Sequence, residues 1–170
     1  MAKILLVTNQ TGRHLTSAIR AAMEAGARGA LAAVGVAEGV DRLRVDLTLV
    51  SDEDLRALSR QYLGADHYTD VMSFSQMEGL DAPAVRGGPR SQLLGDIVVS
   101  LDRATEQAAR AEHPLAAELA LLVAHGVLHL LGHADETPAD AAEMRRLERQ
   151  ALTLAGVESA PPTATTPMEV

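Results

Sequence analysis

The chain has 170 residues, of which 47 % are apolar, and this is enough for one domain with a buried core. It has no cysteine, so disulfide bonds are excluded and a bound metal ion must be held by histidine, aspartate or glutamate. The net charge is −8 and only 2 % of the residues are aromatic, which argues against non-specific nucleic-acid binding and against stacking of single strands on aromatic side chains.

The first third of the chain predicts a strand, a helix and a second strand. The apolar run at 3–8 is typical of a short buried strand. The alanine-rich segment 14–33 has the apolar spacing of a helix, which Thr11 or Thr16 can cap. Apolar side chains at alternate positions then predict a half-buried strand at 42–50.

The middle third predicts one helix and two strands. A serine followed by three acidic residues begins a helix over 51–62. Residues 70–75 have the composition of a strand, and the apolar run at 95–101 predicts another. Between them, residues 76–92 are rich in glycine and proline and are expected to form a mobile loop.

The last third is predicted to be helical. A first helix is expected over 102–112. Pro114 suits the first turn of the next helix, which is expected to end near Gly132. Thr137 begins the last helix, which is expected to end near Gly156.

We expect a single domain over residues 1–156 and a flexible tail over 157–170, since the tail is rich in proline and threonine and has nothing to bury. The fold class is α+β, with a small mixed four-stranded sheet and about five helices. The apolar run 4–7 is too short for a signal peptide, and the segment 115–131 is short for a membrane span. A cytoplasmic protein without membrane contact is therefore predicted.

A candidate metal site lies in the second-last helix. His125 and His129 are four residues apart, so both imidazoles project from one helix face and can reach one ion. Gly132 can end the helix in a left-handed conformation and let the chain turn back, which makes Asp135 the expected third ligand. His133 is the competing third ligand, or a group that lines the cleft. A fourth position left for water is typical of catalytic zinc.

Two histidines at this spacing also occur by chance, and buried histidines often bond only to backbone groups. The residue after His125 is Gly126, whereas zinc metalloproteases place a glutamate there as general base. The residue that peptide cleavage normally uses is therefore missing.

The segment HGVLHLLG, residues 125–132, resembles the signature of the YbeY family, a family of bacterial endoribonucleases and rRNA maturation factors. The segment 58–74 resembles the family's stretch that ends in Thr-Asp-Val-Leu-Ser-Phe. Residues 94–97 resemble its Leu-Gly-Asp-Ile strand, and residues 143–156 resemble its last helix. The resemblance covers residues 43–156 in consistent order.

The resemblance implies a zinc-dependent, single-strand-specific endoribonuclease with one zinc ion on a zincin-like metal helix. It also implies a role in maturation of small-subunit (16S) rRNA and in ribosome quality control. The expected partners are ribosomal RNA, the small ribosomal subunit and its assembly factors, with no DNA. Two other functions remain open: a non-catalytic ribosome-assembly factor with structural zinc, and a metallopeptidase.

The chain departs from the family at the third ligand, where a histidine is usual and this chain has Asp135. A carboxylate is an acceptable zinc ligand, but its negative charge makes the ion a weaker Lewis acid. The ion is expected to polarise a phosphoryl oxygen, to activate water, or both. A ribose 2′-hydroxyl is the alternative nucleophile.

The family also has an arginine, thought to matter for activity, where this chain has Leu63. Arg56 or Arg60 can substitute for it as a phosphate contact, although solvated helix charges are the commoner interpretation. Arg86 and Arg90 in the glycine-rich loop are further candidates for phosphate contacts.

Four more residues are weighed because they lie in or near the shared segments. Asp96 can hydrogen-bond an imidazole of a metal ligand and orient it. Ser73 and His67 also lie in these segments. For all three residues a hydrogen bond at a turn or strand end is the competing interpretation, and it is favoured for Ser73. Glu118 lies seven residues before His125 on the same helix face, where an exposed charge is the favoured interpretation.

Overall fold

The computed structural model describes residues 3–36, 42–64, 69–76 and 92–157, without the side chain of Leu63. Its strands are β1 (Leu5–Asn9), β2 (Leu43–Val50), β3 (Val71–Ser75) and β4 (Gln92–Ser100). Its helices are α1 (Ser17–Ala33), α2 (Asp52–Leu63), α3 (Leu101–Ala111), α4 (Leu115–Leu130) and α5 (Pro138–Ala155). The predicted order of elements is confirmed. Most of the loop predicted at 76–92, and the tail beyond Val157, lie outside the described residues.

The four strands form one mixed sheet in the order β1-β2-β4-β3. β1, β2 and β4 are parallel, and β3 pairs antiparallel with β4 at the edge. The predicted α+β class with a small mixed sheet is therefore confirmed. The register pairs Asp96 with Phe74 and Ile97 with Ser73, which decides which side chains of β3 and β4 face the same side of the sheet.

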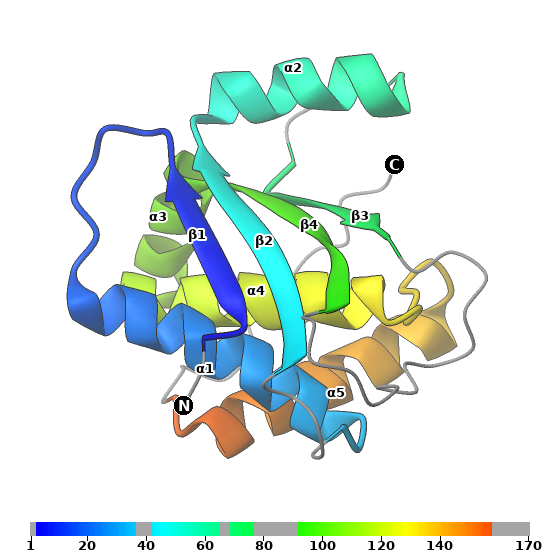
Figure 1. Cartoon of the computed structure of the whole chain (residues 1–170). Helices are drawn as coiled ribbons and strands as arrows, with labels where there is room; N and C mark the ends of the chain where they lie inside the picture. Colours follow the sequence, from blue (N-terminus) through cyan, green and yellow to red (C-terminus); the bar gives the residue numbers. More distant parts are fainter. Residues whose placement is uncertain (1–2, 37–41, 65–68, 77–91, 158–170) are drawn as a thin grey trace.

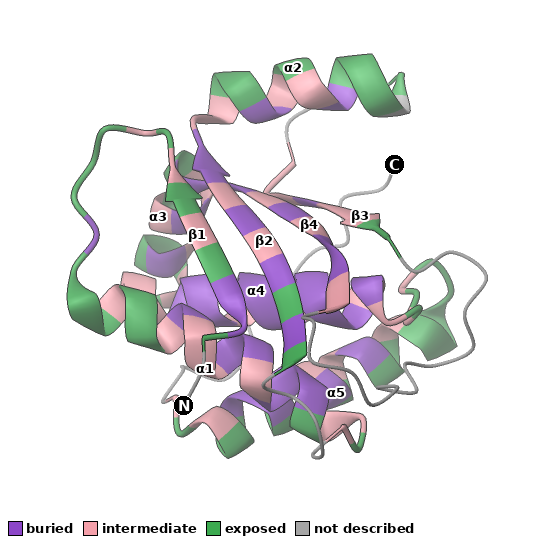
Figure 2. Ribbon diagram, viewed as in Figure 1, coloured by how far each residue is buried: buried purple, intermediate pink, exposed green. Residues whose placement is uncertain are grey.

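Helices cover the sheet unequally. α1, α3, α4 and α5 lie on one face, and α2 crosses the other (Figure 1). The core between the sheet and α4 is aliphatic, as the low aromatic content requires, and α4 is buried along nearly its whole length (Figure 2). The largest fully buried side chains include Ile4, Met23, Leu31, Leu47, Ile97, Leu119 and Leu128.

The helix starts follow the predicted capping chemistry, with one difference. Thr16, and not Thr11, caps α1 by accepting a hydrogen bond from the N–H of Ile19. Thr137 caps α5 in the same way. Pro114 is the residue before the first turn of α4 rather than a member of it, because its backbone is extended and the helix begins at Leu115.

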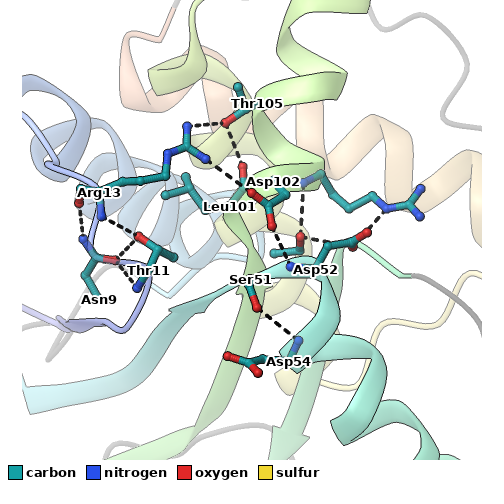
Figure 3. Close-up of polar contacts among 11 residues, drawn as sticks. Asn9, Thr11, Arg13, Ser51, Asp52, Asp54, Leu101, Asp102 and Thr105 are labelled. Carbon is teal, nitrogen blue, oxygen red and sulfur yellow. Dashed lines mark hydrogen bonds and ion pairs between the residues drawn. The ribbon is translucent and has the colours of Figure 1, made fainter.

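The N-termini of α2 and α3 are linked by hydrogen bonds at the carboxyl ends of the parallel strands (Figure 3). The backbone N–H of Asp52 donates to the Asp102 carboxylate at 2.8 Å. The Asp52 carboxylate in turn accepts from the Ser100 hydroxyl at 3.3 Å and from Arg103 at 3.1 Å. Arg13 forms an ion pair with Asp102 at 3.6 Å. Each carboxylate lies at the positive end of a neighbouring helix, so the network fixes α2 to the sheet.

Across the ranges that the structure describes, no single helix has both the length and the apolar character needed to cross a membrane. One pair, α3 with α4, passes the same test of length and composition, but the two helices are bent by 117°.

Candidate metal centre

α4 ends at a glycine in the left-handed conformation, as predicted. Gly132 has a φ of 93°, and its N–H donates to the carbonyl of His129 at 3.0 Å. The N–H of His133 donates to the carbonyl of Leu128, also at 3.0 Å. These two bonds together form a Schellman motif, which turns the chain back beside the helix that it has just left.

The turn brings Asp135 to the two histidines of α4. Its Oδ2 lies 3.7 Å from Nε2 of His125 and 3.5 Å from Nε2 of His129. The two Nε2 atoms are 2.9 Å apart. Among the described residues, these three offer ligand atoms that all lie within 4.8 Å of one another. All three side chains are partly exposed, so the group is reachable from solvent.

The donor set fits a divalent metal ion. Two nitrogens that bind one tetrahedral zinc at about 2.0–2.1 Å lie roughly 3.3–3.4 Å apart, close to the spacings found here. Two imidazoles and one carboxylate form a set that zinc enzymes use, and other divalent metals accept it too. The three residues could therefore hold a metal ion, and the donors alone do not select which one.

A glutamate from α5 lies behind the first histidine. Oε1 of Glu148 is 2.5 Å from Nδ1 of His125, and only 12 % of the Glu148 side chain is exposed. The other ring nitrogen of His125 faces His129 and Asp135. The imidazole is therefore held between a carboxylate on one side and the candidate metal position on the other.

The two histidines have opposite electrostatic surroundings. Burial lowers the pKa of His125, but the hydrogen bond and the charge of Glu148 outweigh it, and the net shift is upward. Burial also lowers the pKa of His129, and the nearby His125 lowers it further, so that the net shift is downward despite Asp135. His129 is thus the imidazole that more readily stays neutral, which is the form that binds a metal.

The comparison with known proteins decides the family. A family model described as Endoribonuclease YbeY matches residues 6–156. The chain belongs to the YbeY family. The Endoribonuclease YbeY of Moorella thermoacetica is 47 % identical over 129 residues, which cover 75 % of this chain and 81 % of the relative. That of Bacillus licheniformis is 35 % identical over 158 residues, which cover 92 % and 98 %.

One solved structure has a similar fold. It is the solution structure of TM1509 from Thermotoga maritima, with a TM-score of 0.50 and 22 % identity, and the match covers 87 % of this chain and 90 % of that chain. At this identity the likeness concerns the fold alone. It agrees with the mixed sheet and the helical layer described above.

The glycine that follows the first histidine of this YbeY chain packs against the sheet. A Cβ atom at Gly126 would lie 2.8 Å from Cδ1 of Ile97 in β4. The position where metalloproteases carry their glutamate therefore has no room for a longer side chain. The structure thus adds a packing reason to the absence of that general base.

The contact that sequence analysis expected from Asp96, a carboxylate against a histidine ring of the candidate site, is made by Glu148 instead. Successive side chains of a strand point to opposite faces, and Ile97 faces α4 at Gly126. Asp96 therefore lies on the other face of the sheet, where its carboxylate accepts a hydrogen bond from Gln76 at 3.5 Å. The prediction placed the right chemistry, a carboxylate on a ligand imidazole, on the wrong element.

The prediction for Glu118 was also wrong, since its side chain is only 7 % exposed. Its Oε2 lies 2.5 Å from Nε2 of His113, whose side chain is 6 % exposed. The residues around it in this turn of α4, Ala117, Leu119 and Ala120, are also buried, so this stretch of the helix does not face solvent. Burial raises the pKa of Glu118, and the hydrogen bond to His113 offsets only part of that rise.

The remaining candidates are placed less centrally. The side chain of His133 is outside the group of metal donors. The Ser73 hydroxyl donates to the Gly126 carbonyl of α4 at 3.4 Å, and Ser73 lies in the middle of β3, so this bond joins strand to helix and is not the expected strand-end bond. Arg60 is exposed in the last turn of α2, across the sheet from α4. Its phosphate contact stays a prediction, as does that of Arg56.

Some predictions lie outside what the structure describes: those for His67, Arg86 and Arg90, and the side chain of Leu63. Glu148 is the residue that sequence analysis missed, and a signal for it exists. The buried stripe of α5 is Met144, Leu147, Ala151 and Leu152, and helical spacing puts Glu148 within that stripe. An acidic side chain on the apolar face of a helix needs a buried partner.

Proposed function

We propose that this YbeY chain is a zinc-dependent, single-strand-specific endoribonuclease that acts in 16S rRNA maturation and in ribosome quality control. The observation that carries the proposal is the convergence of His125, His129 and Asp135 on one position beside a helix end. Membership of a family of endoribonucleases supports phosphodiester hydrolysis as the reaction. The proposed location is the cytoplasm, where ribosomal RNA is processed.

The residues have separate tasks in this reaction. His125, His129 and Asp135 would hold the ion, and Glu148 would keep the first imidazole in place. Zinc, when bound, supplies Lewis acidity toward a phosphoryl oxygen and toward water. The carboxylate of Asp135 lowers the net charge of the site compared with a third histidine, so we propose slower chemistry than in a chain with three histidines.

The nucleophile is either water or the ribose 2′-hydroxyl, and the ends of the products separate the two. Attack by water leaves a 5′-phosphate or a 3′-phosphate, whereas attack by the adjacent 2′-hydroxyl leaves a 2′,3′-cyclic phosphate. A substrate with a single 2′-deoxy nucleotide at the cleavage site is then cut only by the water route. Mass spectrometry of the fragments reads both results.

The decisive experiment compares substrates and a ligand variant. The purified chain is incubated with single-stranded ribosomal RNA, with a duplex of the same sequence and with casein, each with and without zinc, beside His129→Ala. We expect cleavage of the single strand alone, dependent on zinc and lost in the variant. Cleavage of casein would instead indicate a metallopeptidase. Zinc binding without cleavage of any substrate would indicate a non-catalytic assembly factor.

The proposed partners are ribosomal RNA, the small ribosomal subunit and its assembly factors, with no DNA and no membrane. The net charge of −8 opposes general attraction to RNA, so binding should depend on a particular structure or on a partner protein. Sedimentation with purified small subunits, with large subunits and with duplex DNA tests this. Binding to small subunits alone is the expected result, and equal binding to all three would contradict it.

A further inference from the structure

Glu148 is placed to act on the candidate metal site through His125. Its carboxylate contacts Nδ1 of His125 at 2.5 Å and its side chain is mostly buried. The donor group of the candidate metal site comprises His125, His129 and Asp135, so Glu148 lies outside it and contacts the ring nitrogen of His125 that faces away from the group. A metal-binding histidine that gives its second N–H to a carboxylate has a fixed tautomer and a more basic ligand nitrogen.

The contact also joins two parts of the fold. Glu148 lies in α5, 23 residues after His125 in the chain. α5 packs on α1, where Gly29 allows the backbone of Ala151 to approach so closely that a Cβ atom on the glycine would lie 2.1 Å from its carbonyl oxygen. The Nε2 atom of His129, in contrast, lies 2.9 Å from Nε2 of His125, within the same helix.

We propose that Glu148 is the positioning residue of the metal centre and that it couples metal binding to the docking of α5. Its carboxylate accepts the Nδ1–H of His125, which leaves the lone pair on Nε2 directed at the position shared with His129 and Asp135. The ion thereby strengthens a contact that only docked α5 can make. This inference rests on the metal-binding part of the proposed function and assigns that function a residue outside the ligand set.

Metal affinity gives the first test. Zinc and cobalt binding to the full chain are measured by competition with a chelating dye, for the wild type, Glu148→Gln and Glu148→Ala. Loss of a carboxylate that hydrogen-bonds a metal ligand typically weakens metal binding by about 10- to 100-fold, and we expect a loss in this range for Glu148→Ala. For Glu148→Gln we expect a loss of about 10-fold, because the amide oxygen still accepts a hydrogen bond.

The matched control is Glu143→Gln. Glu143 lies in the same helix and carries the same charge, but it is exposed and pairs with Arg146. The Glu143→Gln variant should bind zinc with the affinity of the wild type. Equal affinity in Glu148→Ala and Glu143→Gln, with both folded by circular dichroism, would overturn the inference while the wild type still binds zinc. A wild type that binds no metal would instead overturn the proposed function itself.

Two further readouts do not depend on affinity. In the metal-free chain, nitrogen chemical shifts should show His125 with its proton on Nδ1, and Glu148→Ala should move population to the Nε2–H form. Hydrogen exchange should slow across α5 when zinc is added to the wild type, but not in Glu148→Ala. An unchanged tautomer would overturn the positioning role, and α5 exchange that ignores zinc in the wild type would overturn the coupling.

Discussion

In the described part of the chain, two histidine–carboxylate contacts of 2.5 Å involve α4, and they differ in the surroundings of the second histidine nitrogen. His113 with Glu118 and His125 with Glu148 are both separated by 2.5 Å. The first pair is sealed, with both side chains less than a tenth exposed, and the remaining nitrogen of His113 is buried without a hydrogen-bond partner. The second pair is partly exposed, and the remaining nitrogen of its histidine faces His129 and Asp135.

The surroundings of the second histidine nitrogen separate a candidate metal site from an ordinary histidine–carboxylate contact. A histidine bonded to a carboxylate is only a buried polar pair when no other metal-binding side chain lies near its second nitrogen. It can become one of three metal ligands when a second imidazole and a carboxylate face the same open position. The comparison therefore predicts that substitutions near His125 act on metal binding, and substitutions near His113 on stability.

The largest expected effect is the loss of a ligand histidine. An apparent binding free energy of about 10–16 kcal/mol shared by four zinc ligands gives roughly 2.5–4 kcal/mol for each, so His129→Ala should weaken zinc binding by roughly 100- to 1,000-fold. His113→Ala, on the sealed pair, should leave the affinity nearly unchanged. Chelator competition measures both variants, and similar losses in the two would break the comparison.

The second effect is on stability. Glu118→Ala leaves His113 buried without its partner, and breaking a buried pair in this way costs about 3 kcal/mol in the free energy of unfolding. Urea unfolding followed by circular dichroism measures this loss. The same variant should still bind zinc. A Glu118→Ala variant that loses zinc affinity but keeps its free energy of unfolding would contradict the comparison, because the His113–Glu118 pair would then support metal binding.

The third effect concerns the ligand outside α4. Asp135→Ala removes the only carboxylate of the donor group, and we expect a loss of zinc affinity of about 100-fold, the lower end of the range expected for one lost ligand. Its neighbour Glu136 is exposed and serves as the control, since Glu136→Ala removes the same charge from the same turn. Equal behaviour of the two variants would mean that Asp135 is not a ligand.

The smallest effect is a pH dependence of the sealed pair. Burial raises the pKa of Glu118 above its usual 4.5, so the folded state binds this proton more tightly than the unfolded state does. The contribution of Glu118 is then fully present below pH 4.5 and is lost as the pH rises through the raised pKa.

Comparison with Glu118→Gln isolates that contribution. The unfolding free energy of the wild type minus that of the variant should fall as the pH rises from 4.5, by at most about 1.4 kcal/mol per pH unit for one proton. Urea unfolding at several pH values gives the slope. A difference that grows with pH would show that the charged form of Glu118 is the one favoured by folding.

Much of this protein follows from short stretches of sequence. Apolar runs, one alternating segment and strand-like composition predicted the strands, and serine or threonine caps predicted the starts of three helices. The approach of Asp135 to the histidines was also predictable, because it depends on helical spacing and on one glycine, all within eleven consecutive residues. Local backbone preferences act over this range and are written directly in the residue types.

The tertiary structure alone decided the surroundings of the site. Whether Asp96 or Ile97 faces α4 depends on strand register, and whether Glu118 is exposed depends on what covers its helix. Glu148 reaches His125 because α5 docks on α1 across a gap that a glycine leaves open. Such contacts are made by segments far apart in the chain, and their energy comes from packing that no local pattern encodes.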